Sequence, residues 1–190
     1  TRAMPNLAAN LTLMFNEVDF LDRFAAAAKA GFKGVEFLFP YDYAKQVLKR
    51  KLDENGLTLV LHNLPPGNWA NGERGIGCHG DRVAEFQAGV EKAIEYANAL
   101  GCTQLNCLAG IKPAHRDPLD ARETFIKNLQ YAAPRLKAAG MDVFKNPERY
   151  GANLVNIGDS RMVMIEVEGV LYLYSMGSAA KNDRQEGASQ

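Results

Sequence analysis

The sequence has little that would attach it to a membrane or to nucleic acid. It contains no run of 18 apolar residues, so no segment is predicted to span a bilayer. It also has no excess of basic residues, because Lys plus Arg and Asp plus Glu number 22 each and the formal net charge is zero. A balanced charge provides no general attraction to polyanions. We therefore expect neither nucleic acid nor a membrane among its partners.

Cysteine is scarce as well. The three cysteines, Cys78, Cys102 and Cys107, are odd in number and lack CxxC spacing, so no disulfide framework is predicted. The N-terminal stretch TRAMPNLAANL lacks the basic and then apolar pattern of a signal peptide. We therefore expect a reduced, cytoplasmic protein.

The remaining composition is that of an ordinary globular domain. The chain has 190 residues, of which 47% are hydrophobic, enough for a sizeable core in one domain. Four glycines each follow a stretch with helical spacing: Gly31, Gly56, Gly101 and Gly140. Glycine adopts the left-handed conformation that ends a helix at little cost, so a helix is expected before each one. Asp120, with Glu123 three residues later, is predicted to cap the last of these helices.

Short apolar runs alternate with these predicted helices. Each run is continuously apolar, which is typical of a strand buried on both faces. The runs cover residues 6–15, 34–39, 58–63 and 104–109. Strands that alternate with helices predict an α/β fold with a parallel sheet and right-handed crossovers. Residues 1–140 therefore form four consecutive βα units.

The pattern changes after Gly140. A fifth buried strand is due there, but Lys145, Asn146 and Pro147 occupy its place. Residues 141–176 are therefore predicted to form a divergent segment. Its apolar part is either one long strand or a hairpin that turns at residues 168–169. Residues 177–190 are small and polar, which predicts a disordered tail.

Several blocks of the first three quarters resemble hydroxypyruvate isomerases and the related 2-oxo-tetronate isomerases. The blocks are LAANLTLMFNEVDFLDRF, AGFKGVEFLFPYDY, LVLHNLPPGNWANGERGIG and ALGCTQLNCLAGI, and the likeness covers roughly residues 4–140. The resemblance implies a xylose isomerase-like TIM barrel, a (β/α)8 fold that typically has about 250 residues. Residues 1–140 would then be a half-barrel of four βα units.

The resemblance also implies an activity. Members of this family are intramolecular oxidoreductases that interconvert hydroxypyruvate and tartronate semialdehyde through an enediol, usually with a divalent metal such as Mg²⁺ or Mn²⁺. Their metal ligands and two catalytic glutamates lie in the second half of the barrel, where this chain departs from the pattern. Glu166, in the run MVMIEVE, is the residue we name as catalytic base or metal ligand, and no other metal ligand is identified.

Barrel enzymes hold their substrates at the carboxyl ends of the strands. Five polar residues lie at these ends and are predicted to bind a small hydroxy-carbonyl acid: Asn10, Glu36, His62, Asn63 and Asn106. Each has a structural alternative. A buried amide can satisfy backbone groups, Glu36 can pair with a basic residue of a helix, and His62 can be a core histidine.

The loop over residues 64–80 is long for a connection between a strand and a helix, which is typical of a binding loop. Arg74 in this loop is predicted to hold the substrate carboxylate, and Trp69 to shield the pocket; the alternative is a solvated Arg and a Trp packed at the rim. Two other functions stay open for the whole chain. One is a catalytically inactive half-barrel that assembles as a homo-oligomer, and the other is a binder without turnover.

Overall fold

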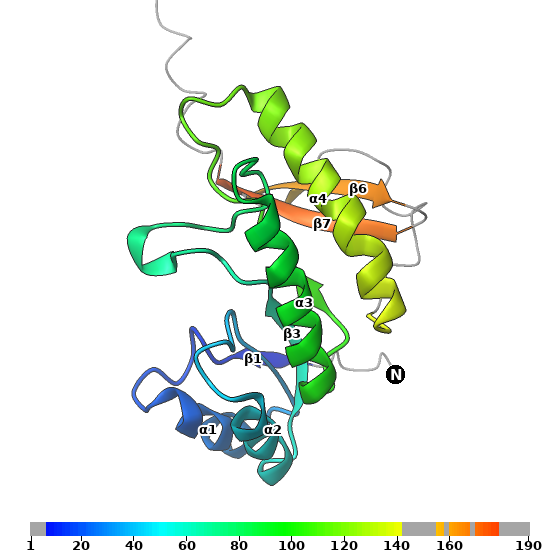
Figure 1. Cartoon of the computed structure of the whole chain (residues 1–190). Coiled ribbons are helices and arrows are strands. Elements are labelled where there is room, and N and C mark those ends of the chain that lie inside the picture. Colours follow the sequence, from blue (N-terminus) through cyan, green and yellow to red (C-terminus); the bar gives the residue numbers. More distant parts are fainter. Residues whose placement is uncertain (1–6, 142–154, 158–159, 168–169, 179–190) are drawn as a thin grey trace, which may run out of the picture.

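The structure is a computed structural model, and it describes residues 7–141, 155–157, 160–167 and 170–178 (Figure 1). Four strands form a parallel sheet in the order β1-β2-β3-β4. Their bounds are Ala8–Asn10 for β1, Gly34–Glu36 for β2, Thr58–Asn63 for β3 and Leu105–Asn106 for β4. The predicted α/β fold with four βα units is confirmed, although β1, β2 and β4 are shorter than the apolar runs that predicted them.

Helices follow the strands and cover one side of the sheet (Figure 1). Their bounds are Arg23–Lys29 for α1, Lys45–Glu54 for α2, Val83–Leu100 for α3 and Pro118–Ala138 for α4, with short 3-10 turns at Phe20–Asp22 and Trp69–Asn71. The start of α4 differs from the prediction. Asp117 and not Asp120 caps it, because the Asp117 carboxylate accepts a hydrogen bond from the Leu119 amide at 2.7 Å.

The side of the sheet that faces the helices forms the core. Ala9, Val35 and Leu59 lie in register on β1, β2 and β3, and all three are buried in one apolar cluster with Phe24 of α1 and Leu48 of α2. Because side chains alternate along a strand, their neighbours in sequence point to the opposite side. We call that opposite side the inner face.

A β-bulge in β3 changes this alternation. Val35 pairs with Leu59, but the next residue, Glu36, pairs with Leu61, so Val60 is the extra residue. A bulge of one residue exchanges the faces of all the residues that follow it. His62 therefore points to the helices and Asn63 to the inner face, the reverse of what uninterrupted alternation from Leu59 would produce.

The segment after α4 does not continue the parallel sheet. Strands β5 (Val155–Ile157), β6 (Ser160–Val167) and β7 (Val170–Ser178) form a separate antiparallel sheet. Val167 pairs with Val170, a pairing that the hairpin interpretation has and one long strand does not. The predicted tail lies outside the described residues apart from its first two positions, which belong to β7.

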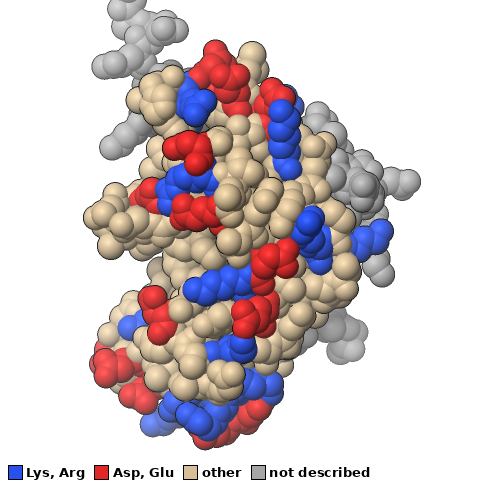
Figure 2. Space-filling model, viewed as in Figure 1, with Lys and Arg blue, Asp and Glu red and all other residues tan. Residues whose placement is uncertain are grey.

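Lys and Arg alternate with Asp and Glu over the side of the molecule that faces the viewer in Figure 2, which carries the helices of Figure 1. Mixed charge of this kind is typical of a solvated surface. Among the helices of the described residues, none combines the length and the apolar character needed to cross a bilayer.

The base of the loop over residues 64–80 is fixed to the segment that follows β4. Gly75 forms an isolated bridge with Ala109, and the Cys78 amide donates to the Ala109 carbonyl at 2.7 Å. Gly75 has a φ of +104°, and a Cβ added there would lie 2.4 Å from the Leu108 carbonyl oxygen. Gly75 therefore allows two backbone segments to approach one another.

Gly75→Ala is expected to destabilise the fold more than Gly101→Ala does. Gly101 has a φ of +69° with nothing within 4 Å of an added Cβ, so only conformational strain of about 1–2 kcal/mol applies. At Gly75 the backbone must also move, for a total of about 3 kcal/mol or more. Urea unfolding of both variants measures the difference, and equal free energies of unfolding would contradict it.

Candidate functional site

The carboxyl ends of β1 and β2 carry the first of two polar pairs on the inner face. Asn10 Nδ2 donates to Glu36 Oε1 at 2.9 Å, and Asn10 Oδ1 accepts from the Thr12 amide at 3.0 Å. The Asn10 amide therefore holds both the turn after β1 and the carboxylate of Glu36. Because Asn10 and Glu36 are only partly buried, this carboxylate is accessible at the rim of the sheet.

The carboxyl ends of β3 and β4 carry the second pair. Asn106 Nδ2 donates to Asn63 Oδ1 at 3.1 Å, and the backbones of the two residues are in register. Asn63 is buried, whereas Asn106 is partly exposed. Since β2 and β3 are adjacent, the two pairs follow one another along one edge of the inner face. Four of the five residues predicted at strand ends therefore share one face.

His62 is the exception, because the bulge directs its ring toward the helices. It is fully buried, and its register partner Leu105 packs into the apolar clusters below the helices. Its ring lies 6.0 Å from that of Tyr41 in an edge-on contact. The expectation that His62 meets Asn10, Glu36 and Asn106 around one cavity is therefore not met, and the core histidine is the reading that this placement favours.

Burial sets the ionisation of the His62 and Tyr41 pair. Desolvation lowers the pKa of His62 to about 4, although the Asn63 carbonyl at 3.1 Å from Nδ1 acts in the opposite direction. Desolvation also raises the pKa of the Tyr41 hydroxyl well above its ordinary value. Both groups are therefore neutral at pH 7. The Tyr41 hydroxyl donates to the Asn63 carbonyl at 2.5 Å, which fixes the end of β3.

Arg74 lies on the exposed part of the loop over residues 64–80. Its guanidinium carbon is 4.0 Å from the centre of the Trp69 ring, and that ring packs against Phe39 at 4.8 Å. Nη1 of Arg74 donates to the carbonyls of Trp69 and Glu73, at 3.2 and 2.7 Å. In the described part of the chain no carboxylate pairs with Arg74, so its charge is available to an anion.

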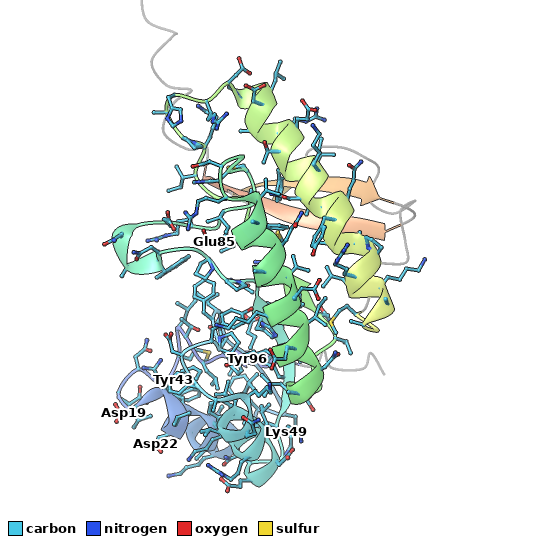
Figure 3. All side chains as sticks on the ribbon, in the orientation of Figure 1. Asp19, Asp22, Tyr43, Lys49, Glu85 and Tyr96 are labelled. Atoms are coloured by element: carbon cyan, nitrogen blue, oxygen red, sulfur yellow. The ribbon has the colours of Figure 1, made fainter. Side chains whose placement is uncertain are left out.

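The neighbouring carboxylate, Glu73, is already engaged. The Glu73 carboxylate forms an ion pair with Arg82 and accepts a hydrogen bond from the Asn68 amide. Arg82 also forms an ion pair with Glu85, at 2.7 Å. The hydrogen bond from Arg82 is the main cause that lowers the pKa of Glu73. Glu85 lies at the first turns of α3 beside the base of the loop, whereas Tyr43 and Tyr96 lie lower, where α3 meets the segment before α2 (Figure 3). This arrangement leaves Arg74 as the cation at the loop tip without an acidic partner among the described residues.

No metal site is identified among the side chains that the structure describes. Among them, no three His, Cys, Asp or Glu residues come together. Cysteine chemistry is not favoured either, because burial raises the pKa of the Cys107 thiol to about 12.

Glu166, the predicted base, lies in β6 of the antiparallel sheet, in register with Leu171. Its side chain lies outside the described residues. The strand that carries it pairs with β5 and β7 and does not extend the parallel sheet. Its catalytic role stays a prediction from the resemblance.

Tyr41 and Thr12 were not predicted to belong to the site. Thr12 Oγ1 accepts from the Leu38 amide at 2.9 Å and so links the loops after β1 and β2. Both residues follow a strand end by a few positions, which is the signal that could have identified them. Their role is to hold the rim, since the side chain of each bonds to a backbone group there.

The same part of the chain resembles known proteins. The family model described as a xylose isomerase-like TIM barrel matches residues 24–167. The chain is similar to the 2-oxo-tetronate isomerase of Cupriavidus necator, with 47% identity over 144 residues, 76% of this chain and 55% of the relative. It is also similar to the hydroxypyruvate isomerase of Escherichia coli, with 51% identity over 133 residues, 70% of this chain and 52% of the relative.

A solved structure shares the fold as well as the sequence. The crystal structure of AP endonuclease, family 2, from Brucella melitensis is 51% identical, with a TM-score of 0.70 over 73% of this chain and 53% of that chain. The chain thus spans about half the length of the relatives it matches. The resemblance found in the sequence is confirmed for that half.

The burial of His62 predicts a loss of stability in acid. Between pH 6.5 and about 4 the unfolded chain binds a proton at this residue and the folded chain does not, so the free energy of unfolding falls as the pH falls through that window. From pH 7 to pH 5 the loss from His62 is about 2 kcal/mol. His62→Leu is expected to remove this part of the pH dependence.

The matched control is His115→Gln, because His115 is exposed. Urea unfolding at pH 7 and pH 5 is the measurement. If His62→Leu loses as much stability between these values as the wild type and the control, the buried neutral state of His62 is wrong.

Proposed function

Because the chain belongs to the xylose isomerase-like TIM barrel family, we propose that it binds a small hydroxy-carbonyl acid and takes part in its aldose–ketose isomerisation. The observation that carries the proposal is the row of polar side chains along the carboxyl ends of β1 to β4, with amides of Asn10, Asn63 and Asn106 and the carboxylate of Glu36. Barrel enzymes bind their substrates at this end. The relatives named hydroxypyruvate isomerase support hydroxypyruvate as the substrate to test first, and those named 2-oxo-tetronate isomerase support a 2-oxo-tetronate as the second.

The proposed reaction moves one proton between adjacent carbons. A base removes a proton from the carbon next to the carbonyl of hydroxypyruvate, and an enediol forms. A proton then returns to the former carbonyl carbon, which leaves the aldehyde of tartronate semialdehyde. No atom is gained or lost overall, so no oxidant or reductant is needed.

The rim residues have the chemistry to recognise this substrate. The Glu36 carboxylate accepts a hydrogen bond from a substrate hydroxyl, while Asn10 keeps that carboxylate in place. The amide group of Asn106 offers a donor and an acceptor to a second oxygen. These roles require polar groups at fixed positions on neighbouring strands, which the two hydrogen-bonded pairs provide.

Arg74 supplies the charge for the substrate carboxylate in this proposal. Its guanidinium is supported by the Trp69 ring and has no carboxylate partner in the described part of the chain. A guanidinium binds a carboxylate through two parallel hydrogen bonds. For that contact the loop over residues 64–80 must bring its tip to the rim when ligand is bound.

The base and the metal are the parts of the proposal that rest on resemblance. Glu166 is the predicted base, and Mg²⁺ or Mn²⁺ is the predicted metal. Since the described side chains do not form a metal site, no step assigned to them depends on the metal.

In two alternative functions the chain does not convert a substrate. One is an inactive half-barrel that assembles as a homo-oligomer, and the other is a binder of small hydroxy acids. Binding of hydroxypyruvate without conversion, with and without Mg²⁺ or Mn²⁺, would favour them. Failure to bind hydroxypyruvate at all would contradict the proposed function.

Arg74→Ala is expected to weaken hydroxypyruvate binding. Loss of a charge-assisted contact with the substrate carboxylate costs about 1.5–3 kcal/mol, which raises the Kd about 10- to 150-fold. The control is Arg50→Ala, because Arg50 is exposed on α2 and lies 4.0 Å from Glu54. Isothermal titration calorimetry measures both, and a Kd for Arg74→Ala equal to that of the control would remove Arg74 from the site.

Glu166→Gln is expected to lower kcat at least about 100-fold, because the amide cannot accept the substrate proton. Glu168→Gln, two positions along the sequence, is the control and is expected to retain turnover. The measurement is conversion of hydroxypyruvate with Mg²⁺ or Mn²⁺ present. Turnover by Glu166→Gln at the level of the control would show that another residue is the base.

A further inference from the structure

Arg23, the first residue of α1, bonds to both ends of the loop that follows β1. Its Nη1 donates to the Leu11 carbonyl at 2.8 Å, and its Nε donates to the Val18 carbonyl at 3.1 Å. In the described part of the chain, no carboxylate forms an ion pair with Arg23. The donors of this half-buried guanidinium are therefore directed to the backbone of the loop.

The loop that Arg23 closes contains a strained residue. Phe15 has a φ of +61°, in the left-handed region that is disfavoured for a residue with a Cβ. Packing does little to hold the tip, because Leu13 leaves 68% of its surface exposed. Backbone strain persists only where surrounding contacts fix the conformation. The two hydrogen bonds from Arg23 are contacts of this kind.

One of these bonds reaches the peptide group that joins Leu11 to Thr12. The carbonyl of this planar group accepts from Arg23, and its N–H donates to Asn10 Oδ1 at 3.0 Å. In a trans peptide the carbonyl and the N–H point in opposite directions. A donor that fixes the carbonyl therefore also fixes the direction in which the Thr12 N–H points.

The Asn10 side chain transmits this orientation to Glu36. A side-chain amide has an acceptor oxygen and a donor nitrogen. Because the Thr12 N–H is a donor, it requires Oδ1 of Asn10, and Nδ2 is left to donate to Glu36 Oε1 at 2.9 Å. The Leu11 amide also donates to the Glu36 carbonyl, at 2.8 Å. Both the side chain and the backbone of Glu36 are thus linked to the segment that Arg23 holds.

We propose that Arg23 is a positioning residue of the binding site. It fixes the peptide group after Leu11, and that group orients the Asn10 amide. The Asn10 amide in turn orients the Glu36 carboxylate, which accepts the substrate hydroxyl. Hydrogen bonds in such a series polarise one another, so the charge of Arg23 strengthens those that follow. The role in substrate binding rests on the proposed function, whereas the orientation of Asn10 rests on the described contacts alone.

The orientation is tested first without ligand. In a proton–nitrogen correlation spectrum of the full chain, the side-chain amide signal of Asn10 is identified by its loss in Asn10→Ala. Arg23→Met removes the guanidinium and is expected to move this signal, as Glu36→Gln does. The matched control is Arg135→Met on α4, because Arg135 also donates to a carbonyl, at 3.0 Å, and lies over a tyrosine ring. An Asn10 signal that Arg23→Met moves no more than the control overturns the proposal.

A double-mutant cycle then tests whether Arg23 acts on binding through Glu36. Calorimetry measures the Kd of hydroxypyruvate for Arg23→Met, for Glu36→Gln and for the double variant. Each single change is expected to raise the Kd about 10-fold, and the double variant also about 10-fold, because the second change removes nothing further. Effects that multiply to about 100-fold would show independent roles and overturn the proposal.

Arg23→Lys keeps both tests decisive if circular dichroism shows that Arg23→Met does not fold. Lys retains a charged donor for the Leu11 carbonyl but lacks the fork that also reaches Val18. A smaller rise in Kd is expected, which again does not multiply with that of Glu36→Gln. A wild type that does not bind hydroxypyruvate contradicts the proposed function alone, since the Asn10 signal still decides the role of Arg23.

Discussion

The extra residue at Val60 is the constraint on which the arrangement of the site depends. Before it, Leu59 faces the helices in register with Val35; after it, Leu61 is in register with Glu36. This one-residue shift directs Asn63 to the inner face beside Asn106 and sends His62 into the core. Without the bulge, a titratable ring would lie at the rim, and an amide would be buried below the helices.

The bulge also explains the network around Tyr41. A histidine directed into the core is neutral, and the Asn63 carbonyl lies 3.1 Å from its Nδ1, whereas its Nε2 has no hydrogen-bond partner among the described residues. The Tyr41 hydroxyl bonds to the same carbonyl, so the end of β3 is held by the buried His62 ring and the half-buried Tyr41 ring. The Asn63 side chain thus projects from backbone that is fixed on the opposite face, as a binding group requires.

Most of the fold could be predicted from local pattern. The glycines at the helix ends and the apolar runs between them identified four βα units. Glycine is the usual residue where a helix ends, and a strand buried on both faces is continuously apolar, so both features are visible in the sequence.

The site was predictable only in part. Asn10, Glu36, Asn63 and Asn106 lie at strand ends on the inner face, and their places in the apolar runs predicted those strand-end positions; the direction of the His62 ring was not predicted. No residue type in the run TLVLHN indicates a bulge. Its position is set by pairing with the neighbouring strand, which the sequence alone does not show. The antiparallel strands after α4 were indicated by Glu168-Gly169 as one of two readings, and pairing again decided between them.

The two ends of the inner face differ in their chemistry. Where the strands begin, the inner face carries Ala8, Gly34 and Val60, which are small and apolar; where they end, it carries amides and a carboxylate. Burial of the first group is favourable only against another apolar surface, whereas the second group needs either water or a polar ligand. The inner face is therefore suited to apolar packing where the strands begin and to water or a polar ligand where they end.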